Sequence, residues 1–197
     1  MKRLLLATRN EGKLRELRGL LHMPDLVLET FAQYPLIGDL EETGATFEAN
    51  ARAKASHAAR SSGVLALGED SGLEVDALGG APGVLSARYS GTHGDDRANL
   101  EKLLRELARA ENRRARFVCT VAVSEPDGEV TATARGTCEG AIALTPRGAG
   151  GFGYDPIFLP DGAHGRTMAE LTSDEKGRLS HRGQALRRIA PFLREVL

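Results

Sequence analysis

The sequence predicts an α/β fold. Short apolar runs typical of buried strands alternate with segments whose leucines or alanines have helical spacing, and helical patterns lie towards both ends of the chain. Strands mixed with helices in this way are typical of a sheet covered by helices. The 197 residues suffice for one domain or for two closely packed lobes, and a content of 41% hydrophobic and 27% charged residues is an ordinary globular balance.

The first half of the chain supplies strands and helices in turn. Apolar runs indicate the strands, and apolar side chains three or four residues apart indicate the helices. In order, the expected elements are a strand over 3–7, a polar turn over 8–12, a helix carrying Leu14, Leu17, Leu20 and Leu21, a strand over 26–31, a loop over 32–45, an alanine-rich helix over 46–62 that ends at Gly63, a strand over 64–67 ending at Glu69 and Asp70, and extended chain over 73–77.

The second half of the chain repeats these signals. A strict alternation of apolar residues indicates a half-buried strand, and Pro126-Asp127-Gly128 is a turn signal. In order, the expected elements are a helix opening near Asp95 with Leu100, Leu103, Leu104 and Leu107, the alternating strand with Phe117, Cys119, Val121 and Val123, strands over 130–135 and 139–144, and a last helix with Leu186, Ile189, Leu193 and Val196.

Composition and charge exclude several classes of protein. The formal net charge of −1 argues against general binding of duplex nucleic acid. No apolar run is long enough to cross a bilayer, and the apolar start of the chain is too short for a signal peptide because Thr8 and Arg9 interrupt it. We therefore expect a cytoplasmic protein. Cys119 and Cys138 lack metal-ligand spacing, so we expect buried free thiols.

One sequence motif is rejected because of its context, and two others are absent from the sequence. Gly148, Gly150 and Gly153 match a dinucleotide-binding spacing, but Asp155-Pro156 follows directly and prevents a helix from opening there. A loop that allows close approach to a flat ligand is the better interpretation of these glycines. The chain has no Walker-type phosphate loop and no zinc-type spacing of His and Cys.

Two expected helix starts carry the wrong charge. A helix N-terminus is partly positive and favours acidic residues, yet basic residues stand at both starts. They are Arg9 and Lys13 at the first helix and Lys176, His181 and Arg182 near the last. A bound anion would offset this repulsion and accept hydrogen bonds from backbone N–H groups. The pattern therefore indicates a polyphosphate ligand, with solvated basic residues as the alternative.

Acidic residues gather in two places. Asp39, Glu41 and Glu42 lie in a loop before the alanine-rich helix, and Glu69 and Asp70 end an apolar strand. Ligand sites in open α/β sheets gather at the carboxyl ends of strands, and carboxylates next to a phosphate suit Mg²⁺. A carboxylate there that does not hold the metal could act as general base on a water molecule. A solvated loop is the alternative for Glu41 and Glu42.

Seven short motifs follow one another along nearly the whole chain. They are Thr8–Lys13, Glu41–Gly44 with Phe47, Glu48 and Asn50, Glu69–Leu73, Gly80–Gly83, Ser86–Tyr89, Gly151–Pro156, and Glu175–Lys176 with Ser180–Arg182. In this order and spacing they resemble the inosine triphosphate pyrophosphatases, and together they are highly specific. The chain departs from many relatives at Ala49, Glu69 and Gly177, where those proteins have glutamate, aspartate and asparagine.

The resemblance implies a fold and an activity. The fold is a single domain over 1–197, with a long central mixed β-sheet flanked by helices and two lobes with an active-site cleft between them. The activity is hydrolysis of the α–β phosphate bond in inosine, deoxyinosine and xanthosine triphosphates, which gives a monophosphate and pyrophosphate and cleanses the nucleotide pool. Mg²⁺ is the implied cofactor and a homodimer the implied assembly, with neither nucleic acid nor membrane as a partner.

The resemblance also implies roles for individual residues. Asp70 matches the general base, and Glu42, Glu69 and Asp70 match the metal-binding acids. Thr8, Asn10, Lys13 and Lys54 match contacts to the phosphates, and later positions match base recognition and phosphate clamping. The full set of expected substrate contacts is Thr8, Arg9, Asn10, Glu11, Gly12, Lys13, Lys54, Ser71, Phe152, Gly153, Tyr154, Asp155, Lys176, His181 and Arg182.

Two other functions would use the same acids and cations. A less selective nucleoside triphosphatase would differ in its products or turn over all purine triphosphates, and a non-catalytic regulator would bind a nucleotide without hydrolysis. Asp70 argues against the regulator, because a protein that only binds a triphosphate gains little affinity from a carboxylate placed close to it. Selectivity against adenine is expected from a donor such as Arg182 or a backbone N–H, which can bond the keto oxygen at position 6 of hypoxanthine and xanthine.

Overall fold

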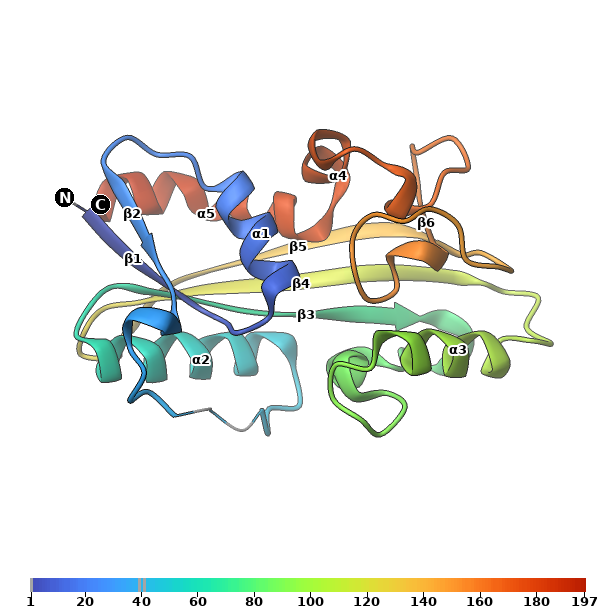
Figure 1. The fold of residues 1–197 in the computed structure, drawn as a ribbon, viewed down its shortest axis with the longest axis horizontal. Helices are drawn as coiled ribbons and strands as arrows, with labels where there is room; N and C mark the ends of the chain where they lie inside the picture. The colour runs from blue at the N-terminus through green and yellow to red at the C-terminus, as the bar shows by residue number, and fades with distance from the viewer. Residues whose placement is uncertain (1, 39, 41) are drawn as a thin grey trace. The chain divides into compact units, whose positions relative to one another are not determined.

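The structure, a computed structural model, describes residues 2–38, 40 and 42–197. Within these residues, six strands form one sheet in the order β2-β1-β3-β4-β5-β6 (Figure 1). They are β1 (Lys2–Ala7), β2 (Leu26–Glu29), β3 (Ala66–Val75), β4 (Arg114–Ser124), β5 (Val130–Ile142) and β6 (Phe158–Pro160). β1 runs parallel to β2 and β3, whereas β5 and β6 are antiparallel. The predicted α/β fold with a mixed sheet is confirmed.

Helices connect these strands and flank the sheet. They are α1 (Glu11–Leu20), α2 (Phe47–Ser62), α3 (Asp96–Glu106), α4 (Ser173–Leu179) and α5 (His181–Val196). Short 3₁₀ helices lie at η1 (Phe31–Gln33), η2 (Asp76–Leu78), η3 (Gly83–Arg88), η4 (Asp155–Ile157) and η5 (Met168–Glu170). Of the predicted acidic loop, Glu42 is described, whereas Asp39 and Glu41 lie outside the described residues.

The chain forms two compact units. The first contains Met1–Asp70, Cys119–Gly136 and Arg182–Leu197, and the second contains Ser71–Val118 and Thr137–His181. The boundaries between the units fall within β3, β4 and β5 and after the first residue of α5. Each unit has a hydrophobic core of its own. The active-site cleft expected from the resemblance stays a prediction.

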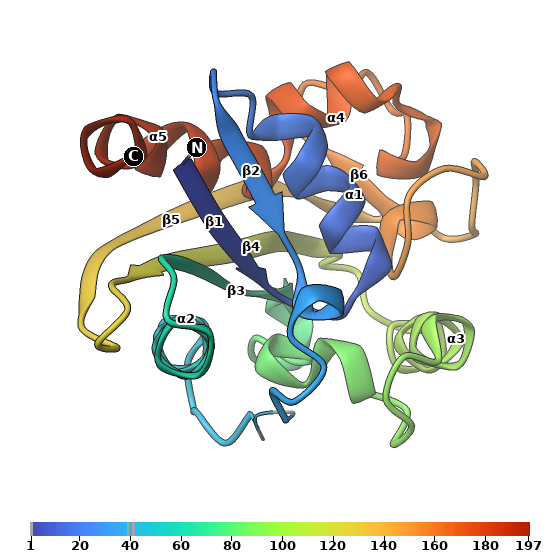
Figure 2. The same cartoon turned by 60° about the vertical axis from the view of Figure 1, so that its left-hand side comes forward.

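In the first unit, α1 and α5 cover one face of the strands and α2 covers the other (Figure 2). Leu4 and Leu6 of β1 and Leu67 of β3 pack against the leucines of α1 and α5. Leu5 of β1 points the other way and packs with Ala58 of α2. Because successive side chains of a strand alternate between its faces, β1 is buried on both sides, as is usual for parallel strands.

The alanine-rich helix α2 begins and ends where the sequence predicts. The Thr46 side chain accepts a hydrogen bond from the N–H of Ala49 at the start, and Gly63 ends the helix with a φ of 71°. The small side chains of Ala51 and Ala55 are fully buried and let α2 approach β3 closely at Gly68. This close approach fixes the polar face of α2 against the middle of β3.

A Gly68→Ala substitution is expected to destabilise the protein. An added Cβ would lie 2.3 Å from the carbonyl oxygen of Ala51 and 2.5 Å from the nitrogen of Ala55, which are backbone atoms of α2. Overpacking of this kind costs about 1–3 kcal/mol of folding free energy. Thermal unfolding measures the effect, with Gly19→Ala as control because a Cβ there meets no atom within 4 Å. An unchanged melting temperature for Gly68→Ala would contradict the close packing.

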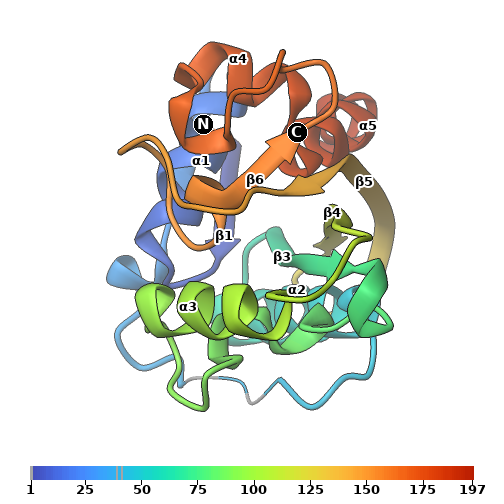
Figure 3. The same ribbon diagram turned by 90° about the vertical axis from the view of Figure 1, so that its right-hand side faces the viewer.

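The core of the second unit lies between α3, the segment around β6, and the parts of β3, β4 and β5 that belong to this unit. Figure 3 shows α3 on one side of β5 and β6 and α4 on the other. α3 begins after Asp95, as the sequence predicts, and the Asp95 side chain accepts a hydrogen bond from the N–H of Ala98. The rings of Phe117 and Phe158 pack edge to face with their centroids 4.6 Å apart.

Several strands differ from their expected bounds. β3 and β5 are each one continuous strand, because Gly72 and Gly136 keep extended backbone instead of breaking it. β4 is buried on both faces and not half-buried, since Val118 and Ala122 are also sealed from solvent. β2 ends at Glu29, where a capping box turns the chain into η1.

The basic residues near the end of the chain divide between two helices. α4 follows the Thr172 cap with Asp174 and Glu175 in its first turn, so Lys176 lies within a helix whose start is acidic. α5 starts at His181 and has no acidic residue in its first turn. The unfavourable charge therefore applies to His181 and Arg182 and not to Lys176.

Two smaller expectations can be compared with the structure. Cys119 and Cys138 are free and buried, as predicted, and burial raises the pKa of the Cys138 thiol to about 12. Of the helices in the described part of the chain, none is long and apolar enough to cross a membrane.

Candidate active site

Asp70 is buried on β3 with both carboxylate oxygens bonded by side chains of α2. Asn50 Nδ2 donates to Oδ2 at 3.0 Å, and Lys54 Nζ donates to Oδ1 at 3.0 Å. Residues four apart lie on one face of a helix, so a single face of α2 holds the carboxylate from both ends. Asp70 itself is only 4% exposed. Its orientation is therefore set by the protein before any ligand arrives.

Lys54 joins Asp70 to Glu42. Its Nζ lies 2.7 Å from Glu42 Oε1 and also donates to the carbonyl oxygen of Glu69 at 3.2 Å. Burial by itself would lower the pKa of Lys54, but the charges of Asp70 and Glu42 outweigh burial and raise the pKa above its usual value. Two carboxylates and one ammonium leave this group with one net negative charge. The group can thus accept a further cation.

Asn50 also fixes the loop that carries Glu42. Its Oδ1 accepts a hydrogen bond from the N–H of Gly44 at 2.8 Å, and its Nδ2 lies 3.4 Å from the Gly44 carbonyl oxygen. A Cβ at Gly44 would lie 2.4 Å from Asn50 Oδ1, so only glycine fits beside this amide. Sequence reasoning did not include Asn50 among the site residues, although Asn50 stands in one of the seven motifs and lies four positions before Lys54.

Glu69 belongs to a different group of charges. Its carboxylate accepts two hydrogen bonds from Arg182, at 3.0 Å from Nε and 2.9 Å from Nη2. Lys13 Nζ lies 3.3 Å from Glu69 Oε1, and Glu16 accepts a further hydrogen bond from Arg182. Burial would lower the pKa of Arg182, but the charges of Glu69 and Glu16 outweigh burial and hold the pKa well above its usual value.

The structure therefore separates Glu69 from Glu42 and Asp70. Adjacent residues of a strand point to opposite faces, and Glu69 and Asp70 follow this rule on β3. Among the described residues, no group of three or more Asp, Glu, His or Cys side chains is placed to hold a metal ion. The pair formed by Glu42 and Asp70, which converges on Lys54, is the part of the predicted metal set that the structure brings together.

The turn before α1 is held by its own polar side chains. Asn10 caps α1 by accepting a hydrogen bond from the N–H of Lys13 at 3.0 Å, and Thr8 Oγ1 accepts one from the N–H of Asn10 at 3.2 Å. Glu11 is exposed and Gly12 is buried in the first turn. The basic start of α1 is thus offset in part by Glu11, and the side chain of Lys13 lies towards Glu69.

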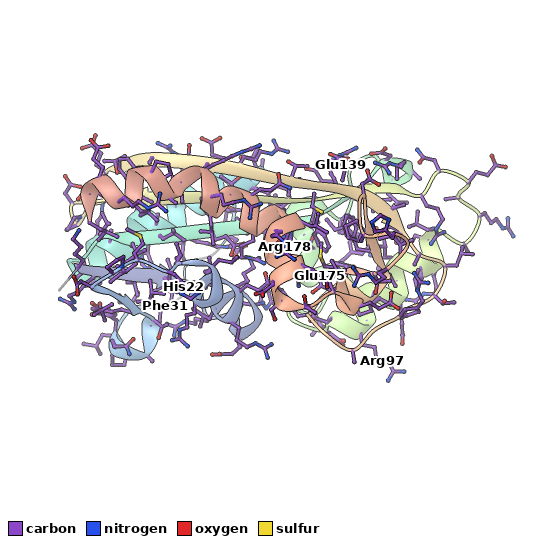
Figure 4. The ribbon with its side chains drawn as sticks, turned by 90° about the horizontal axis from the view of Figure 1, so that it is seen from above. His22, Phe31, Arg97, Glu139, Glu175 and Arg178 are labelled. Atoms are coloured by element: carbon purple, nitrogen blue, oxygen red, sulfur yellow. The ribbon has the colours of Figure 1, made fainter. Side chains whose placement is uncertain are left out.

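Arg9 has structural contacts in addition to its predicted role in substrate binding. Its Nη2 donates to the carbonyl oxygen of Ile37 at 2.7 Å. Its guanidinium lies over the ring of Phe31, 4.8 Å from the centroid, and Phe31 is labelled in Figure 4. These contacts tie the turn before α1 to the segment that follows β2. They do not test whether Arg9 also contacts a substrate.

In the second unit, Asp155 organises the glycine-rich loop. Its Oδ2 accepts hydrogen bonds from the N–H of Phe152 at 2.9 Å and from Lys176 Nζ. A Cβ on Gly151 would meet this oxygen at 1.9 Å, which explains the glycine. The Lys176 ammonium lies 5.2 Å from the centroid of the Phe152 ring, within range of a cation–π interaction. No α-helix opens at this loop, as the sequence predicts.

Neighbouring residues of the second unit hold this loop in place. The N–H of Gly153 donates to Asp96 Oδ2 at 2.7 Å, and the hydroxyl of Tyr154 donates to the carbonyl oxygen of Ser86 at 2.9 Å. Tyr154 is buried, and its hydroxyl bonds to the backbone of Ser86, so this side chain anchors the loop to η3. Ser71 is half-buried on β3, directly after Asp70.

His181 is packed against an aromatic ring. Its imidazole stacks on Phe117 with the ring centroids 4.7 Å apart and the planes 11° from parallel. The residue is 4% exposed. This stacking fixes the ring plane of His181 at the first position of α5.

Glu175, which is labelled in Figure 4, lies in the first turn of α4, and we expect its carboxyl group to have an unusually low pKa. Hydrogen bonds from Arg166 and from the Thr172 cap lower the pKa of Glu175 from 4.5 to about 2. A depressed carboxyl pKa contributes stability that is present above the unfolded value near 4.5 and is lost as the pH falls towards 2. Carboxyl titration by NMR should place Glu175 well below the other glutamates. A value near 4.5 would contradict the capping geometry.

Comparison with known proteins places this arrangement in a family. A profile of the Ham1 family matches residues 4–192, which is nearly the whole chain. The chain belongs to the Ham1 family. It is 50% identical over 196 residues to the dITP/XTP pyrophosphatase of Exiguobacterium sp., and the match covers 98% of this chain and 99% of that protein.

Other Ham1-family proteins also match over nearly the full length of this chain. The dITP/XTP pyrophosphatase of Streptomyces avermitilis is 49% identical over 201 residues, with all of both chains covered. The solved structure of a HAM1 protein from Coxiella burnetii superposes with a TM-score of 0.87 at 42% identity, covering 99% of this chain and 100% of that chain. These matches confirm the resemblance that the seven motifs indicate, and the roles of individual residues stay predictions.

Within this Ham1-family chain, the predicted site residues fall into the two units. The first unit holds the predicted base, metal ligands and phosphate contacts together with Arg182. The second unit holds Ser71, the loop from Phe152 to Asp155, Lys176 and His181. The structure adds Asn50 and Glu16, which bond directly to Asp70 and to Arg182.

Proposed function

We propose that the chain hydrolyses non-standard purine nucleoside triphosphates, those of inosine, deoxyinosine and xanthosine, to a monophosphate and pyrophosphate. The observation that carries the proposal is the carboxylate of Asp70, buried and held at both oxygens by Asn50 and Lys54. A carboxylate held in this way can accept a proton from water without reorganising. The full-length similarity to dITP/XTP pyrophosphatases supports the substrate class.

Mg²⁺ is the proposed cofactor, and the donor set fits it. Glu42 and Asp70 converge on one cationic atom, Lys54 Nζ, with 2.7 and 3.0 Å separations. Mg²⁺ commonly binds one or two carboxylates and completes its shell with water and substrate phosphates. When bound, the ion would neutralise phosphate charge. The one net negative charge of the group formed by Glu42, Asp70 and Lys54 supports this assignment.

The chain's own residues account for the chemical step. Asp70 orients a water molecule and takes its proton as the water oxygen forms a bond to the α-phosphorus. The bond from that phosphorus to the oxygen bridging to the β-phosphorus breaks, and pyrophosphate leaves. Lys13, Lys54 and the start of α1 bind the phosphates, supported by their cationic charge and by backbone N–H groups. Positioning and electrostatics supply most of the acceleration of phosphoryl transfer.

We assign the selectivity for hypoxanthine and xanthine over adenine to hydrogen-bond donors of the protein. Inosine and xanthosine present a keto oxygen at position 6, which Arg182 can bond, whereas adenosine presents an amino group and would leave the donor unpaired. Such mismatches are worth up to ~10⁴-fold in kcat/KM. Phe152 is the proposed stacking residue, and stacking on an aromatic ring contributes about 1–3 kcal/mol per base in other proteins. The other predicted contacts of the second unit keep their proposed role in binding the substrate.

Product analysis tests the proposal. The purified protein is incubated with Mg²⁺ and separately with the triphosphates of inosine, xanthosine, adenosine and guanosine, and all phosphate products are quantified. Fast release of pyrophosphate from the first two, with little from the others, is expected. Diphosphate and orthophosphate as products would contradict attack at the α-phosphorus. Equal turnover of all four would reject the base selectivity, and binding without turnover would favour a regulator.

A cytoplasmic location and a homodimer complete the proposal. The location follows from the substrate, because purine nucleoside triphosphates are used for nucleic-acid synthesis there. The homodimer is carried over from the family resemblance. Analytical ultracentrifugation of the purified chain tests it, and a single species with the 21.1 kDa mass of one chain would reject it.

A further inference from the structure

Glu69 determines the position of the Arg182 guanidinium. The two hydrogen bonds from Nε and Nη2 run in parallel to the two oxygens of one carboxylate, at 3.0 and 2.9 Å. Both side chains are 1% exposed, so water competes little for these bonds. A bidentate pair fixes the plane as well as the place of a guanidinium. A change at Glu69 will therefore change where Arg182 can donate.

The same carboxylate also binds Lys13. The Lys13 ammonium lies 3.3 Å from Glu69 Oε1, the oxygen that also accepts from Arg182 Nη2. Glu16 supplies a second carboxylate, which accepts a hydrogen bond from Arg182 Nη1. Two carboxylates and two cations make this group neutral. Buried charges persist when they are paired in this way, and an uncompensated charge is costly.

The charge balance separates this group from the one around Asp70. A divalent cation bound to Glu69 would stand beside two positive charges already within 3.3 Å of its oxygens. Around Asp70, in contrast, two carboxylates of the described residues, Glu42 and Asp70, lie within 3.0 Å of one ammonium, that of Lys54. The two acids that are adjacent in the sequence thus lie in different electrostatic surroundings.

We propose that Glu69 is a positioning residue for substrate selectivity and not a metal ligand. It orients Arg182 for the base and ties that arginine to Lys13, which binds the phosphates. The inference rests on the proposed function, in which Arg182 donates to the keto oxygen of the base. It replaces the metal-binding role that the sequence resemblance implies for Glu69.

A Glu69→Gln variant tests the proposal with two independent readouts. The amide has the same shape but turns an N–H towards one of the guanidinium donors, so the parallel pair is lost. The ratio of kcat/KM for inosine over adenosine triphosphate should fall by about 10- to 100-fold, because an unaligned donor no longer discriminates the keto oxygen. The Mg²⁺ concentration that gives half-maximal rate should stay at its wild-type value.

Two further variants keep the test interpretable. Glu69→Asp retains the charge and should recover part of the selectivity. Glu74→Gln is the matched control, since Glu74 lies on the same strand with a 26% exposed side chain, 4.0 Å from Arg116. It should change neither readout. Should Glu69→Gln not fold, a loss of selectivity in Glu69→Asp at unchanged Mg²⁺ requirement carries the same conclusion.

The outcomes separate this inference from the proposed function. A raised Mg²⁺ requirement with unchanged selectivity in Glu69→Gln would make Glu69 a metal ligand and overturn the proposal, as would no change in either readout. Failure of the proposed function appears instead in the wild type, as absence of pyrophosphate. For that case, calorimetric binding of inosine and adenosine monophosphates replaces the rates. A preference for inosine that is lost in Glu69→Gln supports the proposal, and a preference that is retained or never present overturns it.

Discussion

An Asp70→Asn variant is expected to fold normally and to lose about 10²–10⁴-fold in kcat on inosine triphosphate, the usual range for removing a general base. The amide cannot take the proton of the attacking water. Its oxygen can still accept the hydrogen bond that Asn50 gives to Asp70. Lys54 loses the charge of Asp70 but keeps its ion pair with Glu42, so the packing around α2 is retained. Steady-state rates of pyrophosphate release, with circular dichroism as a check on folding, measure the effect.

The matched control for Asp70→Asn is Asp161→Asn. Asp161 makes an exposed ion pair with Arg114 at 2.9 Å, and its side chain is 57% exposed. The same change there should leave kcat at the wild-type value, because exposed pairs contribute little. If Asp70→Asn kept a near wild-type kcat, the role of Asp70 as base would be wrong and another group would have to orient the water.

An Arg182→Met variant is expected to lose about 3–5 kcal/mol of folding free energy, which is the range for removing one partner from a buried ion pair. Methionine fills much of the space but leaves the carboxylates of Glu69 and Glu16 without the cation that they share. For a chain of this length, such a loss lowers the melting temperature by roughly 10 °C. Differential scanning calorimetry is the measurement.

Arg97→Met provides the control for the effect of removing an arginine. Arg97 is labelled in Figure 4, and its side chain is 89% exposed in a pair with Glu101 one helical turn away. Its loss should leave the free energy of unfolding close to the wild-type value, because exposed ion pairs contribute little to stability. A melting temperature of Arg182→Met equal to that of Arg97→Met would show that the buried group around Glu69 does not stabilise the fold.

The parts of the fold that the sequence predicts well are those set by local chemistry. The ends of α2 and the start of α3 were predicted close to Thr46, Gly63 and Asp95, where the structure has the caps, because each cap depends on one side chain or on one glycine conformation. The strand ends were predicted less well. The segments over 64–67 and 73–77, and those over 130–135 and 139–144, were expected separately. Each pair is one continuous strand, because pairing with neighbouring strands keeps Gly72 and Gly136 extended, and pairing is not a local property.

In the candidate site, too, the sequence predicts what depends on local chemistry and misses what depends on tertiary packing. The motifs identify Asp70 and Arg182 as candidates, the family resemblance adds Lys54, and strand alternation already implies that Glu69 and Asp70 face opposite ways. Which partners they meet could not be predicted, because Glu69 and Arg182 are 113 residues apart in sequence. Only the packing of α5 against the strands brings them together. The placement of Asn50 between Asp70 and the Glu42 loop likewise depends on how α2 lies on β3.

Hydrolysis of inosine triphosphate in water enriched in oxygen-18 tests the central claim most directly. Attack on the α-phosphorus, with Asp70 orienting the water, places the labelled oxygen in the monophosphate and none in the pyrophosphate. Mass spectrometry of the two products after a single turnover reads this out. Label in the monophosphate alone is the predicted result. Label in the pyrophosphate would mean that water attacks the β-phosphorus, and it would contradict the proposed mechanism.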